Sequence, residues 1–202
     1  IKPFLYSLAM ESGFSPCDKA PNVQQTYMVA GRPWTPRNAS RKRYGEMVTL
    51  KWGLAQSNNW ISAYLMSKLN PQQFVNLLHA YGLNNPDIHP SMALCLGPCD
   101  ASVAEMVSAY TTFVNHVIRT APLFVTRIED NDGNVIAKFQ PRMNEVISSE
   151  SADKMLVLLK GVVDGGTAGR LRFKYGLTGE MGGKTGTTNR NSDAWFMGVT
   201  PE

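Results

Sequence analysis

Three short stretches of this 202-residue chain carry side chains that could take part in nucleophilic chemistry. Lys2 stands near the start, the tripeptide Ser57-Asn58-Asn59 follows a basic segment, and GGKTGTT occupies residues 182–188. A neutral lysine accepts a proton, and a hydroxyl can donate one and accept one. A serine hydroxyl becomes a good nucleophile only when a base removes its proton. Lysine and serine together can therefore support covalent catalysis if the fold brings them into contact.

The stretch GGKTGTT first invites comparison with a phosphate-binding loop. That motif needs glycine at both ends of a four-residue gap, followed by lysine and then serine or threonine. Gly183, Lys184 and Thr185 fit the end of the motif, but its first glycine falls on Thr178. The residues after Lys184 also favour a turn, whereas a phosphate loop leads into a helix. We therefore set the phosphate loop aside.

Composition is typical of one globular domain. The chain is 43% hydrophobic, enough for a sizeable core, and its 18% of charged residues argues against disorder. The net charge of +4 is weak support for nucleic acid, and we expect no such partner. No apolar run approaches the ~20 residues of a membrane span.

The thiols and imidazoles lack the spacing of a metal site, and we expect no bound metal. Cys95 and Cys99 are close enough in sequence for a small bridge, but free, partly buried thiols are the simpler interpretation. We interpret the histidines as structural or surface residues. The full set is Cys17, Cys95, Cys99, His79, His89 and His116.

Hydrophobic periodicity and capping residues predict a mostly helical chain. The first helix is expected to be amphipathic, and nothing in the sequence caps it before Ile1. Thr49 and Asn70 are predicted N-caps, and Ser102 with Glu105 forms a capping box. The helices are expected near residues 1–12, 50–56, 60–69, 71–82, 103–118 and 151–165.

Strands are predicted late in the chain. NDGN at 131–134 separates two β-rich runs and is a strong hairpin signal. Residues 184–188 and 194–200 are predicted strands around a polar turn at 189–192. Alternation along the second strand places Trp195 and Phe196 on opposite faces, so we expect one of them in the core.

A basic segment, GRPWTPRNASRKRYGEM at 31–47, is predicted to be a loop because it is rich in proline, glycine and asparagine. It can be a solvated surface loop, or it can lie near an anionic polymer or lipid. Its basic residues are Arg32, Arg37, Arg41, Lys42 and Arg43.

The reactive stretches match an ordered set of motifs. Class A β-lactamases and penicillin-binding proteins carry S-x-x-K, then S-x-N, then K-T-G. Ser57-Asn58-Asn59 matches the second motif and Lys184-Thr185-Gly186 the third. The flanks WTPRNASRKRYGEMVTLKWGLAQSNN and VVDGGTAGRL, with GGKTGTTNRNSDAWFMGVTP, resemble the transpeptidase domain of class A penicillin-binding proteins. Members of this family are bifunctional peptidoglycan synthases.

The resemblance implies an α+β fold of the β-lactamase/transpeptidase type, with an antiparallel sheet flanked by helices and a mostly helical subdomain. In the family, a sequence like IKPFLYSLAMESG follows the nucleophile, so Lys2 would be the lysine of S-x-x-K. The serine would lie three residues before Lys2. Residues 1–202 would then be the central part of one transpeptidase domain, beginning just after the nucleophile and ending before the last strands and helix. Such a fragment, rich in helix with strands near its C-terminal end, would be inactive alone.

The resemblance also implies a role for each matching polar residue. Lys2 would be the base, and the nearby charge of Lys184 would help to keep it neutral. Ser57 would relay a proton to the leaving amine. Asn59 would orient a lysine and donate to a substrate carbonyl, whereas Asn58 would point elsewhere.

The residues of GGKTGTT would form an edge strand beside which the substrate backbone lies. Lys184 and the hydroxyls of Thr185 and Thr187 would bind the terminal carboxylate of the substrate. Gly186 would allow close approach, and the backbone N–H of Thr187 would contribute to an oxyanion hole. Thr188 would either bind substrate or face away.

The implied activity is that of a serine D,D-transpeptidase, which cross-links peptidoglycan stem peptides and is acylated by β-lactams. The family implies no cofactor. Its implied partners are stem peptides, a lipid-linked precursor, β-lactams and an upstream glycosyltransferase domain. The implied location is the extracytoplasmic face of the cytoplasmic membrane, to which another segment would anchor the protein. A non-catalytic β-lactam-sensing or scaffolding domain is the alternative. A hydrolase is a third possibility, against which KTGTTNRNSDAWF argues.

Overall fold

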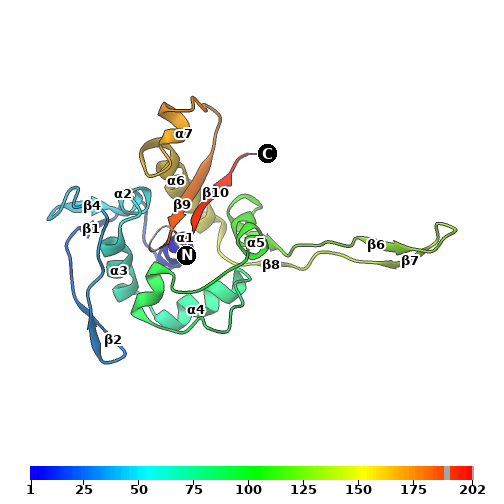
Figure 1. Ribbon diagram of the computed structural model, residues 1–202, viewed down its shortest axis with the longest axis horizontal. Helices are drawn as coiled ribbons and strands as arrows, with labels where there is room; N and C mark the ends of the chain where they lie inside the picture. The colour runs from blue at the N-terminus through cyan, green and yellow to red at the C-terminus, as the bar shows by residue number, and fades with distance from the viewer. Residues whose placement is uncertain (189–191, 202) are drawn as a thin grey trace.

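The computed structural model describes residues 1–188 and 192–201 and combines helices with short antiparallel strands (Figure 1). The helices are α1 Lys2–Glu11, α2 Leu50–Ala55, α3 Asn59–Lys68, α4 Pro71–Ala80, α5 Val103–Val114, α6 Ser149–Gly165 and α7 Arg170–Phe173, with a 3₁₀ helix, η1, at Met92–Leu96. This mixed architecture agrees with the predicted α+β class. No helix in the described part of the chain is long and apolar enough to cross a membrane.

The strands pair two by two. Their bounds are β1 Lys19–Pro21, β2 Tyr27–Val29, β3 Arg32–Trp34, β4 Met47–Thr49, β5 Ile118–Thr120, β6 Arg127–Glu129, β7 Val135–Lys138, β8 Met143–Glu145, β9 Gly182–Thr187 and β10 Ala194–Val199. The antiparallel pairs are β1–β4, β2–β3, β5–β8, β6–β7 and β9–β10.

Helix α1 lies in the middle of the molecule and is buried on every side. Every residue from Pro3 to Met10 is buried, and the helix packs against α2, α3, α4, α6 and η1. The prediction of an amphipathic helix was therefore wrong, since a helix covered all round needs apolar residues all round. Phe4 centres an aromatic cluster in which its ring lies 4.6 Å from that of Tyr81 and 5.7 Å from that of Tyr110.

The predicted caps are confirmed. The Thr49 side chain accepts from the backbone N–H of Trp52 and starts α2, and Asn70 starts α4 in the same way. Ser102 and Glu105 form the complete capping box of α5. These signals were readable because each depends only on residues a few positions apart.

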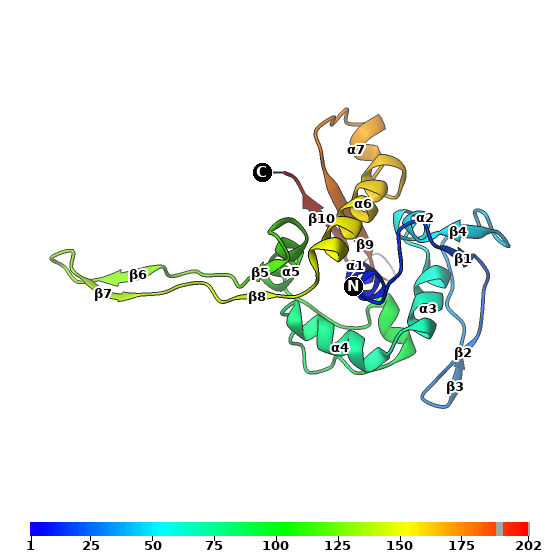
Figure 2. The ribbon, with the colours of Figure 1, turned by 180° about the vertical axis from the view of Figure 1, so that it is seen from behind.

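The distribution of strands differs from the expectation in the first fifty residues. Four short strands, β1 to β4, precede α2, and Arg32–Trp34 pairs with Tyr27–Val29 although this part was predicted to be loop. Each of these strands has three residues, too few for alternation to be recognised in the sequence. The hairpin around 131–134 is confirmed as β6–β7, and it extends away from the body (Figure 2).

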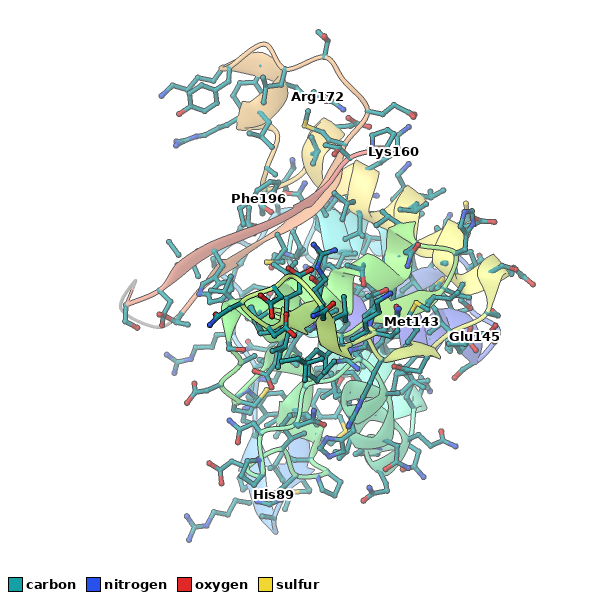
Figure 3. All side chains as sticks on the ribbon, turned by 90° about the vertical axis from the view of Figure 1, so that its right-hand side faces the viewer. His89, Met143, Glu145, Lys160, Arg172 and Phe196 are labelled. Carbon is teal, nitrogen blue, oxygen red and sulfur yellow. The ribbon has the colours of Figure 1, made fainter. Side chains whose placement is uncertain are left out.

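The hairpin β9–β10 packs against α6 and brings GGKTGTT to the middle of the molecule. A Cβ on Gly183 would lie 2.6 Å from the carbonyl oxygen of Met197, so glycine is required where the strands meet. Neither Trp195 nor Phe196 is in the core, contrary to the prediction. Phe196 is 46% exposed and lies at the hairpin (Figure 3), because no element in the described ranges covers its face. Most of the predicted polar turn, residues 189–191, lies outside the described residues. The three cysteines are free thiols, as expected.

The aromatic cluster around α1 predicts where the fold is most sensitive. Phe4→Ala should lower the free energy of unfolding by about 3–5 kcal/mol, because it leaves a cavity among fully buried rings. Phe124→Ala, at a side chain that is 88% exposed, is the matched control and should change it by less than about 0.5 kcal/mol. Urea unfolding followed by tryptophan fluorescence measures both; equal losses would contradict the central position of α1.

Candidate active site

Lys2 lies at the first turn of α1 and reaches the turn between α2 and α3. Its Nζ lies 2.7 Å from Asn59 Oδ1, 3.0 Å from the carbonyl oxygen of Ser57 and 3.2 Å from Ser57 Oγ. All three atoms can accept hydrogen bonds from the ammonium. The structure therefore brings together the first two reactive stretches, which are 55 residues apart in sequence.

The turn that carries Ser57 is fixed by its neighbours. Ser57 has a φ of 52°, in the left-handed region that non-glycine residues seldom adopt. This backbone conformation is unfavourable for serine, so contacts with neighbouring residues must stabilise it. Asn58 supplies part of that hold, because its side chain caps α3 at Ile61 and donates to Asn22 Oδ1 at 2.8 Å. Asn58 thus points away from Lys2, as predicted.

Lys184 reaches the same hydroxyl from β9. Its Nζ lies 2.9 Å from Ser57 Oγ and 2.8 Å from the carbonyl oxygen of Thr185, and its residue is only 6% exposed. Ser57 Oγ therefore stands between two amines. A hydroxyl has two lone pairs and one proton, so it can accept from one amine while it donates to the other when that other amine is neutral.

Burial makes the neutral form of both amines accessible. It lowers the pKa of Lys2 to about 8, against an opposing effect of Cys95. Burial first, and the charge of Lys2 second, together lower the pKa of Lys184 to about 7. Within the described residues, no carboxylate forms an ion pair with either lysine. Near neutral pH the two lysines are therefore not both fully protonated. A neutral amine is then available to exchange a proton through Ser57.

Asn59 is held by the segment 36–38, which sequence reasoning did not connect with it. The side-chain amide of Asn59 donates to the carbonyl oxygen of Arg37 at 2.6 Å, and its backbone N–H donates to Asn38 Oδ1 at 2.6 Å. The indole of Trp60 donates to the carbonyl oxygen of Pro36 at 3.0 Å. This clamp turns Asn59 Oδ1 toward Lys2. WTPRN in the basic segment belongs to the family resemblance, but no spacing rule predicts a contact between it and Ser57-Asn58-Asn59.

Strand β9 presents the remaining predicted residues. The hydroxyls of Thr185 and Thr167 lie 2.6 Å apart, and Thr187 lies on the cleft beside Lys2. A Cβ added at Gly186 would lie 3.5 Å from Trp195 Cβ, an ordinary contact, so nothing within the described protein requires glycine at this position. The Thr188 hydroxyl donates to Asp193 Oδ2 at 3.0 Å and accepts from the backbone N–H of Asp193, the residue just before β10.

The edge of β9 opposite β10 is unpaired among the described strands, and cavities open beside it. One, of about 160 Å³, is lined by Lys2, Ser57, Lys184 and Thr187 among others. A second, of about 270 Å³, shares Lys2, Ser57 and Thr187 with the first. Figure 1 shows the start of α1 beside β9 in the middle of the molecule. Described residues include no cluster of histidine, cysteine or carboxylate side chains that could hold a metal.

One family of known proteins matches this chain throughout. Residues 1–202, the entire chain, match the family described as the penicillin-binding protein transpeptidase domain. The chain belongs to this family. Penicillin-binding protein 1A of Neisseria meningitidis serogroup A is 31% identical over 209 residues, which cover 100% of this chain and 26% of that protein. Penicillin-binding protein 1A of Aquifex aeolicus is 31% identical over 203 residues, which cover 100% of this chain and 27% of that protein.

Solved structures show the same fold for this penicillin-binding protein domain. Penicillin-binding protein 1A from Haemophilus influenzae superposes with a TM-score of 0.87 at 26% identity, covering 98% of this chain and 35% of that one. Penicillin-binding protein A from M. tuberculosis was solved as an imipenem acyl-enzyme complex. It superposes with a TM-score of 0.82 at 19% identity, covering 99% of this chain and 50% of that one, and it therefore supports the fold assignment. The chain spans about a quarter of the length of the curated relatives named above.

The buried lysines make stability depend on pH in a predictable direction. Lys184 has a pKa of about 7 in the fold and near 10.5 when unfolded, so the unfolded chain binds more protons between these values and stability rises with pH there. Lys184→Met removes this dependence. The difference in unfolding free energy, native protein minus variant, should rise steadily from about pH 7 to about pH 9.

Urea unfolding at several pH values measures that difference. The exposed Lys51 offers a matched control, since Lys51→Met removes the same charge without emptying the site. A Lys184→Met difference that stays constant with pH would contradict the burial of a titrating amine.

Proposed function

We propose that this chain is the central part of a serine D,D-transpeptidase domain that cross-links peptidoglycan stem peptides and is acylated by β-lactams. The observation that carries the proposal is the Ser57 hydroxyl held between the amines of Lys2 and Lys184, beside the unpaired edge of β9. A domain that served only as a scaffold would not need two amines with lowered pKa values on one hydroxyl.

In the full-length protein, we propose that a serine stands three residues before Lys2, one turn earlier on the same face of α1. Lys2 in its neutral form removes the proton from that hydroxyl. The serine oxygen then bonds to the carbonyl carbon that joins the two terminal D-alanines. The developing oxyanion accepts from the backbone N–H groups of Thr187 and of the serine itself, and each such donor is typically worth about 2.7–4 kcal/mol.

Collapse of this intermediate breaks the carbon–nitrogen bond. The proton moves from Lys2 through the Ser57 hydroxyl to the departing amine of D-alanine, and the contact of 3.2 Å between Lys2 Nζ and Ser57 Oγ supports the first part of this path. Burial disfavours two charges on one hydroxyl, and the step proceeds from the protonation state in which Lys184 carries the charge and Lys2 is neutral. An amine of a second stem peptide then attacks the ester and restores the serine.

The substrate backbone would lie along β9 as an added strand. Gly186 has no Cβ to obstruct that approach, and Lys184 with the hydroxyls of Thr185 and Thr187 would receive the terminal carboxylate. Thr188 would contribute through its backbone, because its hydroxyl is engaged with Asp193. The proposed partners of the whole protein are stem peptides, the lipid-linked precursor, β-lactams and an upstream glycosyltransferase domain. Its proposed location is the extracytoplasmic face of the cytoplasmic membrane.

Labelling with a fluorescent penicillin tests the proposal. In the full-length protein, Lys2→Ala should slow covalent labelling by about 10²–10⁴-fold, because the attacking hydroxyl loses its base. Lys68→Ala, at an exposed lysine beside the ring of Tyr64, is the control and should label at the native rate. Near-normal labelling of Lys2→Ala would refute the assigned base, and a native protein that never labels would refute the proposed function.

A further inference from the structure

Asn22 is a fully buried polar residue that directly follows β1 and lies against the turn between α2 and α3. A buried amide is unfavourable unless its donors and its acceptor have partners. The backbone of Asn22 continues the β1–β4 ladder. Its N–H donates to the carbonyl oxygen of Glu46 at 2.9 Å, and its carbonyl oxygen accepts from Gly45 at 3.0 Å. The backbone from which the side chain projects is therefore fixed.

The side-chain amide of Asn22 has partners on two sides. Its Nδ2 donates to the carbonyl oxygen of Lys42 at 3.0 Å and to that of Arg43 at 2.7 Å. A carbonyl oxygen can only accept, so the atom that faces these two carbonyls must be the nitrogen. Oδ1 then faces the other side, where it accepts from Asn58 Nδ2 at 2.8 Å. Asn22 thus joins the basic segment to the turn that carries Ser57.

Asn58 transmits this contact to the two helices on either side of Ser57. Its Oδ1 accepts from the backbone N–H of Ile61 at 3.1 Å and caps α3, and this contact again requires that the atom facing Asn22 is the nitrogen. Its own backbone N–H donates to the carbonyl oxygen of Gly53 in α2 at 2.9 Å. Asn58 is therefore held by α2, by α3 and by Asn22 at once.

The left-handed backbone of Ser57 makes this hold necessary. Asn58 is only 6% exposed, so without the Asn22 oxygen its Nδ2 would be a buried donor that has lost its partner. The cost of such a donor is of the same order as the strain at Ser57. The turn could relieve both if the Asn58 side chain rotated out and Ser57 returned to an ordinary conformation. Ser57 Oγ would then leave its place between Lys2 Nζ and Lys184 Nζ.

We propose, on the basis of the proposed function, that Asn22 is a positioning residue that acts through Asn58 to keep the Ser57 hydroxyl between the two amines. The middle residue of the S-x-N motif is then more than a spacer in this chain. Its amide caps α3 with the oxygen and uses the nitrogen to bind a buried partner 36 residues earlier in the sequence. The alternative is that Asn22 only anchors the basic segment.

The rate of covalent labelling of the full-length protein by a fluorescent penicillin separates these roles. Rapid-quench measurements at increasing penicillin concentration give the first-order rate constant of acylation at saturation and the concentration at half the maximal rate. The saturating rate constant belongs to each folded molecule. A variant that merely lowers the fraction of folded protein therefore leaves that constant unchanged.

Two substitutions at Asn22 divide its contacts. Asn22→Ala removes all of them and should lower the saturating rate constant by about 10- to 100-fold, because Ser57 Oγ moves from its place. The concentration at half the maximal rate should change little, since penicillin binding does not require the displaced hydroxyl. Asn22→Asp keeps an oxygen that accepts from Asn58 but loses the donors to the basic segment, and it should retain most of the native rate constant.

Asn58→Ser tests the same contact from its other end. A serine oxygen still caps α3, but the donor to Asn22 is gone, so acylation should slow as it does in Asn22→Ala. The double variant should be no slower than the slower single variant, because both changes break one contact. Asn70→Ser makes the same change at the exposed N-cap of α4 and is the matched control, which should keep the native rate constant. Asn58→Ser also decides the matter if Asn22→Ala does not fold.

The outcomes distinguish the two proposals. A native protein that never labels would refute the proposed function itself. A native protein that labels, with native-like saturating rate constants in Asn22→Ala and Asn58→Ser, would overturn the positioning role alone. Equal losses in Asn22→Ala and Asn22→Asp would limit Asn22 to anchoring the basic segment and would also overturn it, as would losses that multiply in the double variant.

Discussion

A partly buried Lys2 and a buried Lys184 share one serine hydroxyl, and the chemistry of the site depends on that contact. Lys2 and Lys184 approach Ser57 Oγ to 3.2 Å and 2.9 Å, from a helix and a strand at opposite ends of the sequence. Burying two amines side by side is unfavourable while both are charged, so the site favours a state in which one of them is neutral. That same state is the one able to remove a proton from a nucleophile.

The fold can hold this arrangement because its central helix carries Lys2. With Pro3 to Met10 buried all round, α1 has little freedom to shift, and Lys2 projects from its first turn. The α2–α3 turn is fixed by the contacts of Asn58, and β9 is fixed against α6 and β10. The segment 36–38 then orients Asn59 toward Lys2. Each side chain of the candidate site is thus held by an element whose own position is decided by packing.

Local signals in the sequence predicted a large part of this structure. Thr49, Asn70 and the Ser102–Glu105 box begin helices because a cap depends on residues a few positions apart. The motifs predicted which lysines and which serine would meet. Long-range features were not predictable. The sequence did not show that α1 is buried all round, because that burial depends on packing against five other elements. It did not show that Phe196 is exposed, because exposure depends on whether another element covers that face of β10. The contact of Asn38 with Asn59 joins residues 21 positions apart and leaves no periodic trace.

The state of the two lysines can be measured directly by nuclear magnetic resonance. Protein with ¹³C-labelled lysine is titrated, and Lys184→Met and Lys2→Arg assign the two buried side chains. One of the pair should titrate with a pKa of about 7 to 8, because burial disfavours two charges on one hydroxyl. If the signals of both Lys2 and Lys184 titrated with the pKa of exposed lysines, above about 10, neither amine could act as the base near neutral pH, and the account would be wrong.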